Sequence, residues 1–152
     1  DRLTGMEYLT FMADVYQVPS PVREERIHYF LDMFGLTDAA RDLIKSYSHG
    51  MKQKIVLTGA LIHNPALLVL DEPMVGLDPR SSHLLKELMR EHCARGNTVF
   101  FSTHVLEVAE KLCDRIGIIH KGKLIAIGTL DELRRGEQAG SLENIFLELT
   151  ES

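Results

Sequence analysis

The sequence predicts an α/β fold in which a helical segment precedes a core of alternating strands and helices. In the first 64 residues, apolar side chains recur at helical spacing. From Pro65 onwards, short continuous apolar runs alternate with helical patterns, as is typical of strands in a parallel sheet. The length of 152 residues and the hydrophobic content of 45% are those of an ordinary globular chain. We therefore expect a helical subdomain at residues 1–64 and an α/β segment at residues 65–152.

Helix signals account for the first segment. A capping box at residues 4–7 predicts a helix that runs to about Gln17. Ser20 before Pro21 predicts a second helix, capped by the Ser20 side chain and closed at Gly35.

Two more helices are expected before the pattern changes. Thr37 can cap a short helix that ends near Ile44. Ser48 can cap another that runs to the break at Asn64 and Pro65.

The second segment alternates strands and helices. Residues 66–70 form a continuous apolar run, which predicts a central strand buried on both faces of a sheet. The other expected elements are a helix from Asp78-Pro79 to Gly96, a strand at 98–102, a helix at 105–113, strands at 116–119 and 123–127 paired across a turn at Lys121-Gly122, a capping box at 129–132 and a last helix around 142–149. The only loop of any length is expected at residues 136–140.

Composition excludes several classes of partner and site. The net charge of −5 repels phosphate backbones, so we expect no nucleic-acid partner. The longest apolar run, residues 66–70, is far shorter than the roughly 18 to 20 residues that cross a bilayer. Cys93 and Cys113 are expected to be reduced core thiols of a cytosolic protein. Five histidines lack the spacing of metal ligands and are expected at the surface or at helix ends: His28, His63, His83, His92 and His120.

Two adjacent carboxylates, Asp71 and Glu72, follow the apolar run directly. Ligands of open α/β sheets bind at this carboxyl end of the strands. The arrangement has the form of a Walker B strand followed by a catalytic glutamate, in which the first carboxylate holds Mg²⁺ and the second activates water for phosphoryl transfer. By itself the pair indicates only a nucleotide hydrolase, and one acidic residue at a strand end is common.

Three further motifs narrow the prediction. Asp78 lies in the segment Val-Gly-Leu-Asp-Pro, His104 ends the segment Ser-Thr-His after the next strand, and Ser48 and Gly50 lie in Tyr-Ser-His-Gly-Met-Lys-Gln before a helix. In this order the motifs resemble the ATP-binding cassette (ABC) family, with its signature sequence, Walker B strand, D-loop and switch histidine. The resemblance implies a P-loop NTPase-like fold and covers essentially the whole chain.

The resemblance also implies roles for these residues. Asp71 would organise Mg²⁺, Glu72 would act as general base, and His104 would contact the γ-phosphate of ATP. Ser48 and Gly50 would bind ATP held by a second ATPase subunit, and Asp78 would communicate across that dimer. A capped helix N-terminus is an anion site in any case, although Ser48 also reads as a plain helix cap.

The signature departs from the family pattern, usually Leu-Ser-Gly-Gly-Gln, at Tyr47, His49 and Met51. A side chain at His49 leaves less room for a close backbone approach than Gly would. Residues 117–124 match a P-loop pattern, but Leu124 stands where Ser or Thr must bind Mg²⁺, and the segment reads as a hairpin.

These 152 residues contain no other P-loop candidate and no family Gln-loop. We therefore expect the C-terminal portion of an ABC ATPase, namely the helical subdomain and the second half of the core, which by itself would be inactive.

The expected function is the ATP-binding and ATP-hydrolysing subunit of an ABC transporter, on the cytoplasmic face of the membrane through a transmembrane permease. The C-terminal segments 131–133 and 141–146 are similar to those of prokaryotic exporters. An alternative is a soluble ABC ATPase that acts on nucleic acid or ribosomes, although the sequence contains no long coiled coil and no basic linker. A third possibility is a binding module without catalysis. The pair Asp71 and Glu72 disfavours it, because such a module has no chemical need for these carboxylates.

Overall fold

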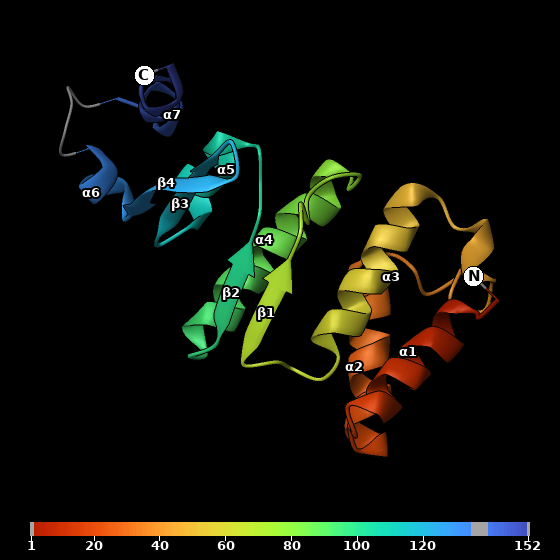
Figure 1. Cartoon of the computed structure of the whole chain (residues 1–152). Helices are drawn as coiled ribbons and strands as arrows, with labels where there is room; N and C mark the ends of the chain where they lie inside the picture. Colours follow the sequence, from red (N-terminus) through yellow and green to blue (C-terminus); the bar gives the residue numbers. More distant parts are fainter. Residues whose placement is uncertain (1, 135–139, 152) are drawn as a thin grey trace. The chain divides into compact units, whose positions relative to one another are not determined.

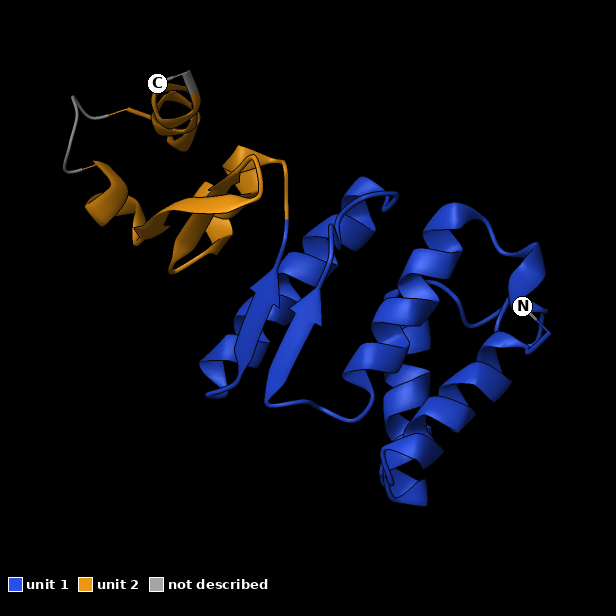
Figure 2. Ribbon diagram, in the orientation of Figure 1, with its two compact units in different colours: residues 1–102 blue, residues 103–152 orange. Residues whose placement is uncertain are grey.

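The computed structural model describes residues 2–134 and 140–151. It contains both helices and strands (Figure 1). The chain divides into two compact units, residues 1–102 and 103–152 (Figure 2). The predicted α/β class is confirmed. The expected division between residues 1–64 and 65–152 stays a prediction. The helices of the first unit share one core with its strands.

Three helices, α1 (Gly5–Val15), α2 (Ser20–Met33) and α3 (His49–Leu61), open the first unit. The predicted capping box of α1 is present: the Thr4 amide donates to the Glu7 carboxylate at 2.8 Å, and the Glu7 amide donates to the Thr4 hydroxyl at 3.2 Å. The helices bury a common apolar core whose largest fully buried side chains include Leu9, Leu31, Leu36, Ile55 and Ile62.

Two details of this helical part differ from the sequence-based expectation. The N-cap of α2 is Pro19 and not Ser20, which is already the first helical residue. The helix expected between Thr37 and Ile44 is also wrong, because this segment consists of turns followed by a short 3₁₀ helix, η1 (Ile44–Ser46). Its backbone bonds to the start of the chain instead: the carbonyls of Ala40 and Asp42 accept from Met6 and Gly5.

The sheet of the first unit consists of β1 (Leu67–Leu70) and β2 (Thr98–Phe101), which pair in parallel and are joined by α4 (Pro79–Ala94). Leu68 pairs with Val99 and lies in the core together with the α4 residue Leu88. Within the described residues β1 pairs with β2 alone, so the prediction of a central strand buried on both faces is wrong for this sheet. Only alternate side chains of β1 are packed, because successive residues of a strand point to opposite faces.

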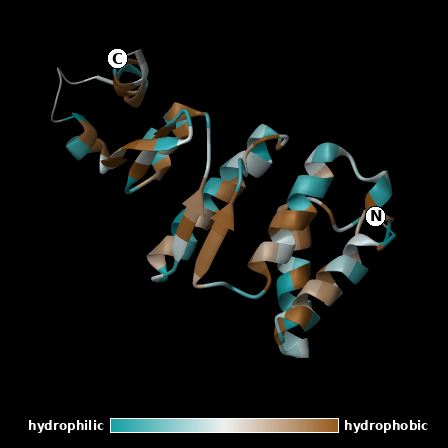
Figure 3. Cartoon of the chain, viewed as in Figure 1, coloured by the Kyte–Doolittle hydropathy of each residue, from teal (hydrophilic) through white to brown (hydrophobic). Residues whose placement is uncertain are grey.

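The other face of this sheet is apolar and exposed. Leu67, Val69 and Phe100 are 57%, 63% and 68% exposed, on the two strands that Figure 3 colours as hydrophobic. The register of β1 and β2 places Val69 beside Phe100, so the exposed side chains of the two strands form one surface. Leu67 and Val69 also line an open hollow of about 300 Å³ beside Tyr16 and His63.

We expect this face to make the isolated chain self-associate, because covering each large apolar side chain contributes about 1.5–3 kcal/mol. Light scattering over a concentration series should show the mass rising for the chain and rising much less for Phe100→Glu. Tyr29→Glu, at an exposed aromatic residue of α2, is the matched control and should associate as the unchanged chain does. A monomer at all concentrations would contradict the expectation.

The second unit contains α5 (Leu106–Leu112), the strands β3 (Ile116–His120) and β4 (Lys123–Gly128), α6 (Leu130–Arg134) and α7 (Leu142–Glu151). β3 and β4 form an antiparallel hairpin whose turn residues Lys121 and Gly122 both have positive φ, 47° and 76°. Two positive φ values match a type I′ turn. The reading of residues 117–124 as a hairpin is therefore confirmed. The loop expected at 136–140 lies mostly outside the described residues.

A small separate core holds this unit together, with Leu142 fully buried and Ile116, Ile118 and Ile145 nearly so. Glu110 of α5 joins two later segments: its carboxylate accepts from Arg134 at 2.8 Å and from the Leu142 amide at 3.3 Å.

Some single-residue expectations need correction. Cys93 is exposed and not a core thiol, whereas Cys113 is half-buried and burial raises the pKa of its thiol. His92, expected at the surface, is buried, and its Nε2 lies 2.8 Å from the Pro65 carbonyl oxygen. No helix in the described part of the chain has the length and apolar character that a bilayer crossing requires.

Candidate functional site

The carboxyl ends of β1 and β2 bring Asp71 and Ser102 together. The two strands are parallel and in register, so the residues that follow them meet at one edge of the sheet. The Ser102 hydroxyl donates to Oδ1 of Asp71 at 2.5 Å. It also accepts from the Glu72 backbone amide at 3.0 Å, so one hydroxyl holds both acidic residues at the strand end.

Glu72 begins a sharp turn. Its φ is 44°, in the left-handed region that non-glycine residues rarely adopt. Its carbonyl accepts from the Val75 amide at 3.1 Å, and the following Pro73 is fully buried. Strained residues of this kind cluster at functional sites, where the surrounding structure holds them in place.

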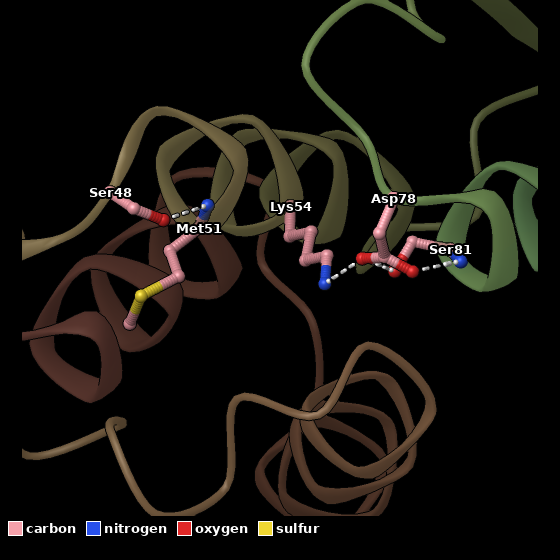
Figure 4. Close-up of polar contacts among 5 residues, drawn as sticks. All are labelled: Ser48, Met51, Lys54, Asp78 and Ser81. Carbon is pink, nitrogen blue, oxygen red and sulfur yellow. Dashed lines mark hydrogen bonds and ion pairs between the residues drawn. The ribbon is translucent and has the colours of Figure 1, made fainter.

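Ser48 caps α3. Its hydroxyl accepts from the Met51 amide at 3.3 Å, as Figure 4 shows, so the predicted cap is confirmed. The remaining amides of the first helical turn and the helix dipole favour an anion at this end. A phosphate is an anion of the kind that such a helix end binds.

Gly50 lies directly against the loop that joins β1 to α4. A Cβ placed on Gly50 would come 2.7 Å from the carbonyl oxygen of Gly76, so only glycine fits without a shift of backbone. A Cβ on Gly76, whose φ is 79°, would lie 2.5 Å from the His49 ring. The His49 ring, where the family pattern has Gly, is thus accommodated because residue 76 has no side chain.

Asp78 ends this loop and begins α4. As N-cap of α4 it accepts from the Ser81 amide at 2.9 Å and from the Ser81 hydroxyl at 2.7 Å. Lys54 of α3 donates to its Oδ2 at 2.8 Å (Figure 4). The hydrogen bond from Lys54, followed by those from Ser81, holds the pKa of the Asp78 carboxyl well below its usual range.

This depressed pKa predicts an acid-sensitive contribution to folding. Because the folded state binds the Asp78 proton more weakly than the unfolded chain, the contribution is complete well above about pH 3.9 and is lost as pH falls below it. The urea midpoint should therefore fall less between pH 6 and pH 3 in Asp78→Asn than in the unchanged chain. Lys54→Met, which removes the main partner, should show the same reduced dependence. Parallel pH curves for all three chains would contradict the assignment.

The predicted site residues therefore fall into groups. Asp71 and Glu72 lie at the strand ends on Ser102, and Ser48, Gly50 and Asp78 lie on α3 and the loop packed against it. His104 is an exposed residue of the second unit, just before α5.

The chemistry of the strand end fits magnesium. Mg²⁺ is usually held by one or two carboxylates together with substrate phosphates and water. Asp71 offers such a carboxylate, exposed and oriented by Ser102. Among the described residues, no three side chains of His, Cys, Asp or Glu converge on a metal, so a dedicated all-protein cage is absent there.

Sequence reasoning missed two residues of this region, Ser102 and Lys54. Ser102 stands directly before the Thr103-His104 pair, and the pairing of strand ends was a signal that could have identified it. Lys54 stands four residues after Gly50, hence on the same face of α3.

Comparisons with known proteins agree with the motifs. Residues 19–110 match the family model described as "AAA domain, putative AbiEii toxin, Type IV TA system". The chain is 44% identical over 127 residues to the Nod factor export ATP-binding protein I of Rhizobium leguminosarum bv. viciae, covering 84% of this chain and 41% of that protein. It is 42% identical over 131 residues to the linearmycin resistance ATP-binding protein LnrL of Bacillus subtilis (strain 168), covering 86% and 42%.

A solved structure described as the ATP-binding subunit of an ABC transporter superposes with a TM-score of 0.93 at 38% identity, covering 97% of this chain and 62% of that one. The chain spans between 38% and 62% of the length of the curated relatives it matches.

Proposed function

Because the chain carries the AAA domain of the matched model and belongs to the ATP-binding proteins of ABC transporters, we propose that it is the C-terminal portion of a subunit that binds and hydrolyses ATP to drive transport. The paired carboxylates Asp71 and Glu72 at the end of β1, held by Ser102, are the observation that carries the proposal.

Glu72 acts as the general base in this proposal. Its carboxylate accepts a proton from the water that attacks the γ-phosphate, and its fixed backbone turn keeps the side chain at the strand end. Asp71 would hold Mg²⁺, which when bound neutralises charge on the phosphates of ATP. Ser102 orients Asp71 and ties it to the Glu72 amide.

Ser48 and Gly50 serve a second subunit. The N-terminus of α3 offers backbone amides and a positive dipole end, and Gly50 lets this end of the helix lie directly against the loop that contains Gly76. We assign these residues to the γ-phosphate of ATP held on the P-loop of the other subunit of a dimer. His104 is assigned to the γ-phosphate and Asp78 to communication across the same dimer.

The remaining partners are part of the same proposal, and the names of the relatives support it. A transmembrane permease would receive the energy of hydrolysis, and the subunit would lie on the cytoplasmic face of the membrane through it. Export is favoured over import because two relatives are named for drug resistance and for Nod factor export. The alternative of a soluble ATPase acting on nucleic acid or ribosomes is not favoured, since similar proteins are named as ATP-binding proteins of transporters or of resistance and export, and the net charge is −5.

The proposal is tested by calorimetry and phosphate release on two proteins. The complete subunit should bind Mg-ATP and release phosphate steadily. The 152-residue chain should do neither, because it lacks the lysine and the backbone amides of a P-loop, which supply most of the phosphate contacts. A complete subunit without ATP hydrolysis would overturn the proposed function, and micromolar binding with turnover by the chain alone would overturn the assignment of the P-loop to another segment.

A further inference from the structure

The helix α3 and the loop from Asp71 to Asp78 contact one another over two helical turns. At the first turn, Gly50 meets the Gly76 carbonyl so closely that a Cβ would come within 2.7 Å of it. One turn later, Gln53 Nε2 donates to the Pro73 carbonyl at 3.5 Å, and Lys54 donates to Asp78 at 2.8 Å. Gly50, Gln53 and Lys54 have the spacing of a single helix face.

Lys54 differs from the other ion-pairing lysine of the described chain. Its side chain is only 15% exposed, while that of Asp78 is 50% exposed. The pair Lys111 and Glu107 on α5 is similarly short, at 2.6 Å, but both side chains are at least 70% exposed. Exposed pairs contribute little because solvent screens them, whereas a shielded lysine keeps a defined position.

Asp78 has a second fixed partner. It caps α4 through Ser81, so a bond from Lys54 reaches the helix that follows the loop as well as the loop itself. Lys54 therefore links three elements: α3, the loop and α4.

We propose that Lys54 is a positioning residue that fixes the N-terminus of α3, with Ser48 and Gly50, relative to the loop that carries Asp78. The inference rests on the proposed function, because Ser48 and Gly50 matter to catalysis only if they bind ATP on the other subunit. Lys54 touches neither nucleotide nor metal in this proposal. It keeps two nucleotide-facing segments in one geometry, and such geometry decides the rate because small misplacements of positioning groups are costly.

The first experiment compares Lys54→Met, Lys54→Arg and Lys111→Met in the complete subunit. Lys54→Met should lower kcat roughly ten- to hundredfold with the ATP affinity unchanged, because the P-loop still binds ATP while the opposing segments are misplaced. Lys54→Arg should restore most of the rate, since it keeps the charge and the donor. Lys111→Met, which also removes a lysine–carboxylate pair, should behave as the unchanged subunit does.

A second comparison uses Asp78→Asn, which retains a good N-cap but loses the charge that Lys54 contacts. If Lys54 acts through Asp78, the double variant should be no slower than the slower single variant. Additive losses would overturn the inference, as would an unchanged kcat in Lys54→Met, or an ATP affinity that falls in parallel with kcat.

A third measurement does not depend on activity. Amide exchange in the 152-residue chain should quicken at Val75 and Leu77 in Lys54→Met, because both amides donate within the loop. Exchange that stays as in the unchanged chain would overturn the inference. A complete subunit that hydrolyses no ATP would instead overturn the proposed function, and the exchange result would still decide whether Lys54 fixes the loop.

Discussion

Replacing Glu72 with Gln in the complete subunit is expected to lower ATP hydrolysis by roughly 10²–10⁴-fold, the usual contribution of a general base. The amide has the shape of the carboxylate but cannot accept the proton of the attacking water. ATP binding should persist, because the P-loop makes most phosphate contacts. The backbone bond from the Glu72 amide to Ser102 does not involve the side chain, so the strand end keeps its geometry.

Phosphate release under steady-state conditions and calorimetric ATP titration measure the two quantities separately. Glu91→Gln is the matched control, since Glu91 is an exposed residue of α4 whose ion pair with Arg95 is long, at 3.4 Å. Its turnover should equal that of the unchanged subunit. A Glu72→Gln subunit that keeps its turnover would remove Glu72 from the role of base, and one that loses ATP binding would indicate a structural role.

Replacing Gly50 with Ala is expected to destabilise the 152-residue chain by up to about 2 kcal/mol. Two effects oppose each other. Ala favours a helix by about 1 kcal/mol over Gly. Overpacking costs about 1–3 kcal/mol, and here the obstacle is the Gly76 carbonyl, a backbone atom that cannot rotate away as a side chain would. The overpacking term should therefore win.

Urea denaturation of the chain at neutral pH measures the difference in free energy of unfolding. Glu25→Ala, at an exposed position inside α2, is the control and should change stability by no more than about 0.5 kcal/mol. If Gly50→Ala were more stable than the unchanged chain, helix propensity would outweigh the contact, and the close approach of α3 to the loop would be wrong.

Local signals in the sequence predicted much of the fold. The capping boxes at Thr4 and Thr129, the cap at Ser48 and the turn at Lys121-Gly122 are all present, since each depends on residues within four positions of one another. The prediction of a helix from Thr37 to Ile44 was wrong for the opposite reason. Its backbone groups bond to Gly5 and Met6, more than thirty residues earlier, and no local pattern encodes that choice.

The candidate site divides in the same way. The positions of Asp71 and Ser48 followed from a strand end and a helix start. The contact of Gly50 with Gly76 and the bond of Lys54 to Asp78 join segments more than twenty residues apart, and only the packing of α3 on the loop brings them together. Burial of His92 against Pro65 was missed likewise, because a histidine at a helix end usually faces solvent.

The left-handed backbone of Glu72 sets a limit on engineering this chain. Glycine adopts φ near 44° without steric cost, whereas a residue with a Cβ in a sparsely populated conformation costs on the order of 1 kcal/mol or more. A library selected for thermal stability alone would therefore favour glycine at position 72 and discard the carboxylate. Thermostabilised variants should keep this position fixed and seek their gains elsewhere, because the carboxylate that the chemistry needs is here attached to a residue with a steric cost that glycine would not have.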